Sequence, residues 1–124
     1  MGAYNDVVVT KVFTAKVVAA SESALSGVID MGSLSQEGNC GLQVALTGDG
    51  TATFEAVVSN HLDDFIRPST SAAIKTGFVK TSGPGSDGKD AFGFSIVPHR
   101  YMKIQITETG TSDSVTVTAY LATN

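Results

Sequence analysis

Apolar and polar residues alternate with a period of two along most of the chain. In Thr51–Ser59, for example, Ala52, Phe54, Ala56 and Val58 occupy every second position. This spacing places one set of side chains on one face of a β strand. No stretch sustains the 3.6-residue period of an amphipathic helix over three turns. The pattern therefore predicts an all-β protein.

Turn-forming residues separate the alternating stretches at intervals of about 8–12 residues, a spacing typical of a β-sandwich, jelly roll or small barrel. We expect an antiparallel β-sandwich with a jelly-roll-like arrangement, formed by residues 1–124 as one domain, with residues 1–6 as a candidate N-terminal arm. In one strand, alternation places Leu25, Ile29 and Met31 on the same face. About eight strands are expected: Val7–Val18 (bent), Leu25–Met31, Cys40–Leu46, Thr51–Ser59, Ala72–Lys80 (one strand, or two around Gly77), Ala91–Val97, Tyr101–Thr107 and Ser114–Ala122.

Two tight hairpins are expected from the turn residues. Asp49 and Gly50 lie between two alternating stretches, and both central positions of a type I′ turn favour residues that tolerate positive φ. Residues 108–113, ETGTSD, are expected to join the last two strands in the same way. Each hairpin would make its two flanking strands neighbours in one sheet.

Charge and composition limit the function classes. The formal net charge is −4, only 16% of residues are charged, and no cluster of Lys and Arg offsets the acidity. Such a surface repels phosphate, so direct binding to nucleic acid is not expected. No apolar run approaches the roughly 20 residues that span a bilayer, and the N-terminus lacks the basic-then-apolar order of a signal peptide. We expect no membrane association.

The segment from Gly83 to Asp90 has the GxxxxGK spacing of a phosphate-binding loop. The position after Lys89 should offer a hydroxyl group to magnesium, and it is an aspartate. The loop should also open a helix, whereas the following residues alternate as a strand does. A surface turn is the better interpretation.

No cofactor or metal site is expected. The pairs Asp63 and Asp64, and Asp87 and Asp90, lack the alternating oxygen ligands and terminal glutamate of a calcium loop. The spacing of the two histidines and the cysteine matches no zinc pattern.

No catalytic residue is expected either. Cys40 is the single cysteine, and no basic residue or helix start lies near it in the sequence to lower its pKa. His61 and His99 lie far apart from it and from each other, so a Cys-His-Asp arrangement would depend on the fold. We expect that the chain is not an enzyme.

Three long segments carry a resemblance to a known family. They are FTAKVVAASESALSGVIDMG, LQVALTGDGTATFEAVVS and SGPGSDGKDAFGFSIVPHRYMKIQITETGTSDSVTVTAYLA, which together cover most of the chain. The chain resembles small virion proteins that tailed bacteriophages encode near their major capsid genes. The resemblance implies a β-sandwich, often trimeric, that decorates or cements the head lattice. Its partners would be the major capsid protein or other virion subunits, and it would join the virion in the host cytoplasm.

Exposed aromatic and valine residues are the candidate contacts with a partner. The N-terminal MGAYNDVVV either adds a strand to a partner's sheet edge or forms the first strand of its own sandwich. Tyrosines on neighbouring strands are also a candidate stacking platform, which keeps open a carbohydrate- or receptor-binding module of a phage tail. The candidate interface residues are Tyr4, Val7, Val8, Val9, Tyr101 and Tyr120.

Overall fold

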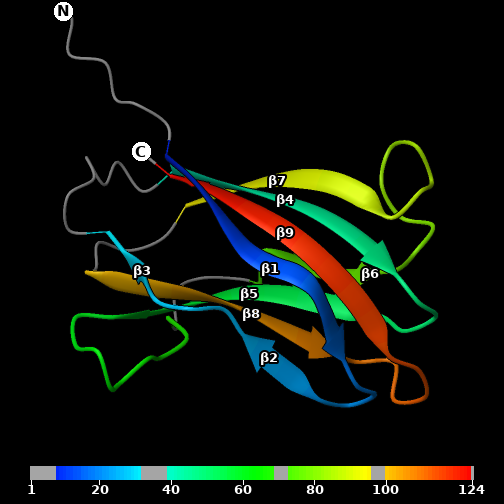
Figure 1. Cartoon of the computed structure of the whole chain (residues 1–124), viewed down its shortest axis with the longest axis horizontal. Coiled ribbons are helices and arrows are strands. Elements are labelled where there is room, and N and C mark those ends of the chain that lie inside the picture. The colour runs from blue at the N-terminus through cyan, green and yellow to red at the C-terminus, as the bar shows by residue number, and fades with distance from the viewer. Residues whose placement is uncertain (1–7, 32–38, 69–72, 96–99, 124) are drawn as a thin grey trace, which may run out of the picture.

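The computed structural model describes residues 8–31, 39–68, 73–95 and 100–123. Within these ranges there is no helix, and the strands stack as two layers (Figure 1). The strands are β1 (Val8–Val18), β2 (Ser23–Leu25), β3 (Ile29–Asp30), β4 (Asn39–Thr47), β5 (Ala52–Ser59), β6 (Lys75–Phe78), β7 (Lys89–Ser95), β8 (Tyr101–Glu108) and β9 (Val115–Thr123). The predicted all-β class is confirmed.

The sheets have jelly-roll topology. Sheet A has the order β1-β9-β4-β7, and sheet B the order β2-β8-β5-β6, with β3 also paired to β8. Every pairing between strands is antiparallel. The pairs β1–β9, β2–β8, β4–β7 and β5–β6 describe one long hairpin whose tip lies between β5 and β6. Rolling that hairpin brings β9 against β4 and β8 against β5, as in other jelly rolls. The predicted antiparallel sandwich is thus confirmed.

Both predicted hairpins are wrong. β4 and β5 belong to different sheets, as do β8 and β9, so each connection crosses from one layer to the other. Positive φ occurs at Gly48, at 96°, and at neither Asp49 nor Gly50, so the type I′ turn is absent. The Gly50 N–H instead donates to the Ser114 carbonyl at 3.2 Å. The β4–β5 and β8–β9 connections therefore lie side by side and are joined by this hydrogen bond.

β2 and β3 are two halves of one strand that a bulge interrupts. Leu25 lies opposite Gln105 and Ile29 opposite Met102, so four steps along one strand match three along β8. An extra residue reverses the alternation of faces. Leu25 is consequently 49% exposed while Ile29 and Met31 are buried, which corrects the prediction that all three share one face.

Other strand predictions need small changes. β1 is bent, as expected, by register shifts between Lys11 and Phe13 and between Phe13 and Lys16. β6 is one strand that contains Gly77, at φ 65°. The predicted strand Ala91–Val97 begins earlier, at Lys89, and its last two positions lie outside the described residues.

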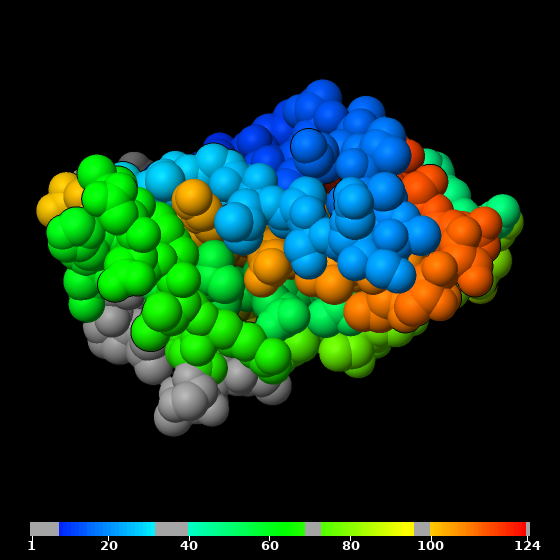
Figure 2. All heavy atoms as spheres, turned by 90° about the horizontal axis from the view of Figure 1, so that it is seen from below, coloured from blue at the N-terminus to red at the C-terminus, as the bar shows by residue number. Residues whose placement is uncertain are grey.

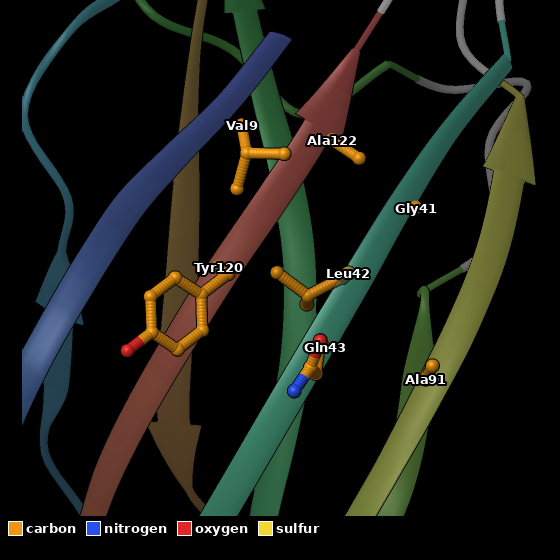
Figure 3. A pocket seen from close by; sticks show the side chains of 7 residues that line it. All are labelled: Val9, Gly41, Leu42, Gln43, Ala91, Tyr120 and Ala122. Atoms are coloured by element: carbon orange, nitrogen blue, oxygen red, sulfur yellow. The ribbon is translucent and has the colours of Figure 1, made fainter. Parts of the chain in front are cut away.

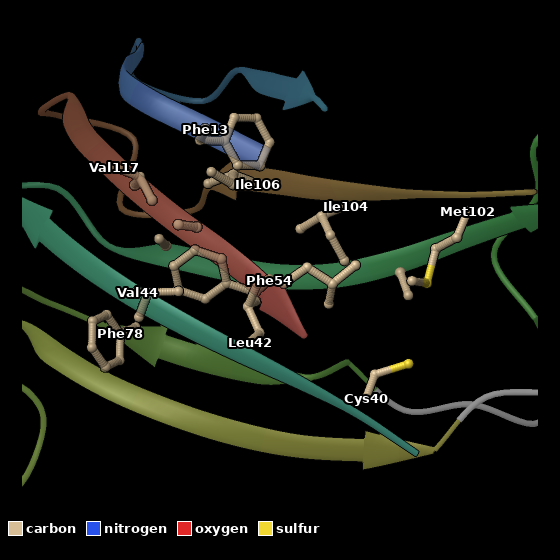
Figure 4. Packing of buried hydrophobic residues seen from close by; sticks show 14 of the residues in the cluster. Phe13, Cys40, Leu42, Val44, Phe54, Phe78, Met102, Ile104, Ile106 and Val117 are labelled. Carbon is tan, nitrogen blue, oxygen red and sulfur yellow. The ribbon is translucent and has the colours of Figure 1, made fainter. Parts of the chain in front are cut away.

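The core fills the space between the two sheets (Figure 4). The side chains that alternate inward from β4, β5, β8 and β9 are buried, among them the four that were predicted to share one face of β5. Three aromatic rings pack together between the layers, with the Phe54 ring centroid 5.8 Å from that of Phe78 and 6.3 Å from that of Phe92. The buried apolar residues that face inward from these four strands are Cys40, Leu42, Val44, Leu46, Ala52, Phe54, Ala56, Val58, Met102, Ile104, Ile106, Val115, Val117, Ala119 and Leu121.

The outer faces of the two sheets differ. Residues 60–68 fold over sheet B: Arg67 pairs with Glu55 at 2.8 Å, and the Lys103 ammonium lies 4.6 Å from the Phe65 ring centroid. This loop forms the green projection at the left of Figure 2. No loop in the described ranges makes such contacts with the outer face of sheet A.

Candidate functional site

The outer face of sheet A carries a shallow hollow of about 210 Å³ (Figure 3). Strand register explains how it forms. Ala122 lies opposite Gly41, and Gly41 lies opposite Gly93, so three small residues cross β9, β4 and β7 in one row. Val9 continues the row on β1, opposite Ala122. Val9, Ala122 and Gly41 line the hollow, and Gly93 continues the row beyond it on β7. We call this row the floor, above which another surface can approach the backbone closely.

A second row forms the rim of the hollow. Tyr120 lies opposite Gln43 on one side and Lys11 on the other, and Gln43 lies opposite Ala91. The Tyr120 side chain is 37% exposed, and the Lys11 ammonium lies 5.6 Å from its ring centroid. The rim therefore offers apolar area, one amide and one ammonium group, a set that suits contact with a protein surface rather than acid–base chemistry.

No steric contact among the described residues requires glycine at the two glycine positions of the floor. Neither Gly41 nor Gly93 has positive φ. A Cβ on Gly41 would lie 3.9 Å from the Ala122 Cβ, and a Cβ on Gly93 would lie 4.0 Å from the Cys40 carbonyl oxygen, both ordinary contacts. Glycine within a strand costs roughly 0.5–1 kcal/mol relative to alanine. Such glycines often mark places where another backbone or a ligand approaches.

The structure separates the predicted interface residues. Val8, Val9 and Tyr120 belong to sheet A, whereas Tyr101 belongs to sheet B. Tyr101 lies beneath the Arg100 guanidinium, 5.3 Å from ring centroid to Cζ. The prediction that the two tyrosines lie on neighbouring strands is therefore wrong. Tyr4 and Val7 lie outside the described residues.

The candidate nucleophile is buried. Burial raises the pKa of the Cys40 thiol to about 11, so the neutral thiol is the form present at neutral pH. His61 is exposed on the loop after β5, and His99 lies outside the described residues. Within the described ranges, no group of three or more His, Cys, Asp or Glu side chains is placed to hold a metal ion.

The GxxxxGK segment forms a turn that leads into β7. Gly83 and Gly88 have φ of 94° and 74°. A Cβ on Gly83 would lie 2.1 Å from the Lys89 carbonyl oxygen, and one on Gly88 would lie 2.4 Å from that of Leu46. The turn itself therefore requires both glycines, and the interpretation as a surface turn is supported.

A buried carboxylate, Glu108, escaped the sequence analysis. It accepts backbone N–H groups from Ser21 at 3.0 Å, Thr51 at 2.8 Å, Gly110 at 2.6 Å and Thr111 at 2.9 Å. These bonds, first those from Thr51 and Ser21, lower its pKa to about 2. The sequence did indicate that Glu108 is buried, because position 108 continues the inward alternation of β8.

No protein-family model matches the chain, and no curated protein matches it either. Solved structures give weak likenesses. YomS, a protein derived from the SPBc2 prophage, has 12% identity and a TM-score of 0.47, covering 99% of this chain and 98% of that one. PliG, a periplasmic inhibitor of g-type lysozyme from Aeromonas hydrophila, has 12% identity and a TM-score of 0.45, covering 94% and 84%.

The coat protein of Tobacco streak virus has 9% identity and a TM-score of 0.34, covering 100% of this chain and 90% of that one. All three TM-scores lie below 0.5, so none of these likenesses carries an argument about function. In the described part of the chain, no helix is long and apolar enough to cross a membrane.

Proposed function

We propose that this chain is a structural protein of a tailed-bacteriophage virion, which binds the head lattice as a decoration or cement protein and stabilises it. Its partners would be the major capsid protein or neighbouring virion subunits, and its role would be structural rather than catalytic. The resemblance along most of the sequence supports this proposal, and the jelly-roll fold, which viral capsid domains often use, is compatible with it.

The outer face of sheet A carries the proposal. Its floor, formed by Ala122, Gly41 and Gly93, has neither charges nor long side chains. Docking on such a floor removes few charged groups from water, and charge depletion is typical of the centre of a protein interface. Val9 and Tyr120 supply apolar area at its edge. A rigid sandwich with a flat, weakly charged face suits attachment to a lattice of identical subunits.

The test uses shells assembled from the major head protein of the genome that encodes this chain. Purified protein should co-sediment with these shells at saturable occupancy and raise the temperature at which they break open. Gly41→Arg should weaken binding by about tenfold or more, because it fills the floor with a charged side chain.

Gly27→Arg is the matched control, because Gly27 is exposed in the bulge of sheet B and a Cβ there meets nothing within 4 Å. It should bind shells as the wild type does. Absence of binding by the wild-type chain would refute the function. If Gly41→Arg and Gly27→Arg lose shell binding equally, the docking face is not the outer face of sheet A.

The alternative, a carbohydrate- or receptor-binding module of a phage tail, has less support from the geometry. Tyr101 and Tyr120 lie on different sheets and so form no shared platform. The Lys11 ammonium also lies over the Tyr120 ring. Screening the same purified protein on a glycan array tests this alternative directly.

A further inference from the structure

Among the described residues, the first four of β1 form an open edge of sheet A. β1 lies at the end of sheet A, and β9 is its partner within the sheet. Val8–Lys11 pair with β9 in unbroken register. Beyond them the register shifts twice, and Ala15, at φ 44°, gives its N–H to the Thr118 hydroxyl at 3.0 Å. Bulges blunt a strand edge against further pairing, so the second part of β1 is protected and the first is not.

The edges of sheet B are protected in other ways. β2 and β3 are short and separated by the bulge, and β6 has four residues that begin with Lys75. β7 lies at the other edge of sheet A and is regular. None of its large hydrophobic side chains is exposed. On β1, in contrast, Val8 is 43% exposed and Val9 is 62% exposed. The edge of β1 thus combines open backbone groups with uncovered apolar area.

We infer that the edge of β1 pairs with the same edge of a second copy of this chain. The pairing is antiparallel about a two-fold axis and joins the two four-stranded sheets A into one. Symmetric contacts of this kind are the commonest way in which soluble proteins form dimers. This inference concerns the chain in solution and stands whether or not the proposed function is correct.

Symmetry restricts the register. The two-fold axis of an antiparallel pair is perpendicular to the sheet, so residues that face each other must lie on the same face of both copies. Centring the axis on Val9 satisfies this condition. Val9 then lies against Val9 of the other copy on the outer face, and Val8 lies against Thr10 on the opposite face. Neither of these pairs brings like charges together.

A second copy fits this edge better than a head-to-tail arrangement does. Pairing β1 with β7 of another copy would place Val9, on the outer face, against the small residues Ala91, Gly93 and Ser95. The symmetric arrangement places valine against valine or threonine, and pairs of β-branched residues stabilise antiparallel sheets. The apolar area that β1 leaves exposed is then covered by its own counterpart.

The arrangement also bears on docking. An axis perpendicular to the sheet keeps both outer faces of sheet A on one side of the dimer, so two floors would be presented together. If the proposed function holds, each dimer would engage the head lattice through two linked sites, which raises apparent affinity without any new contact.

Disulfide trapping tests the register. Directly opposite residues in an antiparallel pair have Cα atoms about 4.5–5.5 Å apart, within the range of about 4.4–6.8 Å that a disulfide spans. Val9→Cys should therefore form a covalent dimer under mild oxidation. The wild type is the control, because Cys40 is buried with its pKa raised to about 11 and should stay unlinked. Ala91→Cys on β7 should also stay monomeric on a denaturing gel.

Mass measurement in solution supplies the second test. The wild type should be a dimer at micromolar protein concentration. Val9→Lys should raise the dissociation constant of the dimer by about tenfold or more, and Ala91→Lys should leave that constant unchanged. Val9 is exposed, so Val9→Lys should keep the wild-type circular dichroism spectrum. A wild type that stays monomeric, a trimer with no dimer, or dissociation by Ala91→Lys alone would overturn the inference. So would failure of Val9→Cys to cross-link.

Discussion

Glu108 shows how one residue can hold one end of the molecule together. Its four N–H donors come from three of the connections that carry the chain between sheets: β1 to β2, β4 to β5 and β8 to β9. The residue is 1% exposed. A buried carboxylate without such partners would pay a large desolvation cost, which four donors aimed at its two oxygens offset.

Glu108→Gln should lower stability and change its dependence on pH. The folded pKa of about 2 lies below the value of about 4.3 for an unfolded glutamate. The stabilisation is therefore complete above the unfolded pKa and is lost as the pH falls towards 2. An amide NH₂ cannot accept the N–H groups that one carboxylate oxygen holds. We expect a lower urea midpoint at pH 7 and a flatter stability profile between about pH 5 and pH 2.

The measurement is urea unfolding followed by circular dichroism across that pH range. Glu22→Gln is the control, because Glu22 is an exposed glutamate of the same connection between β1 and β2. It should leave both the midpoint and the acid dependence close to those of the wild type. An acid dependence in Glu108→Gln as steep as in the wild type would contradict the assignment.

At the scale of elements, alternation located most strands but did not determine which strands pair. Asp49 and Gly50 are good hairpin residues, yet the chain there crosses between sheets, because Gly50 bonds to Ser114 and Thr51 to Glu108. Turn propensity reports only local geometry. Pairing in a jelly roll depends on contacts between residues far apart in the sequence, and no local pattern encodes them.

The candidate site was predictable in the same partial way. Val9 and Tyr120 stood out from the sequence as large side chains on strands. Gly41 and Gly93 did not, because a glycine has no side chain to mark a face of a strand. Their meaning emerged only when register placed them beside each other and beside Ala122. A surface formed by glycines and alanine can be recognised only after the pairing of the strands is known.

The bulge between β2 and β3 provides a prediction at this scale. Ser26 is buried, and its Oγ accepts the Ile104 N–H and donates to the Gly27 carbonyl, both at 2.9 Å. Ser26→Ala leaves the Ile104 N–H without that acceptor and should cost about 1–3 kcal/mol in unfolding free energy. Ser23→Ala, which removes an exposed bond to Thr107, should cost less than about 0.5 kcal/mol. Equal losses in the two variants would show that Ser26 does not hold the bulge.

For the whole molecule, the contact between sheets decides whether the two layers behave as one body. Phe54 and Phe78 project from sheet B and Phe92 from sheet A, and the Phe78 and Phe92 centroids are 5.6 Å apart in an edge-on arrangement. Aromatic pairs of this geometry add to the apolar area that each ring buries. Because each sheet contains strands from both halves of the sequence and buries its apolar face against the other, we expect the two layers to fold and unfold together.

Phe54→Ala should therefore weaken the entire fold. Phe54 is fully buried, and such truncations cost about 3–5 kcal/mol. Against the roughly 5–15 kcal/mol that stabilises a typical domain, this loss would leave the variant marginally stable. Phe65→Ala removes the same atoms from the loop over sheet B, where the ring is only partly buried, and should cost distinctly less.

Urea unfolding of both variants can be followed by circular dichroism and by tyrosine fluorescence, a summed signal to which Tyr120 on sheet A, Tyr101 on sheet B and Tyr4 contribute. Coincident transitions are expected in the wild type and in Phe54→Ala, because loss of one layer exposes the apolar face of the other. Separate transitions for the two signals would mean that the sheets are held independently. In that case the central aromatic cluster would not be the contact that unites the sandwich.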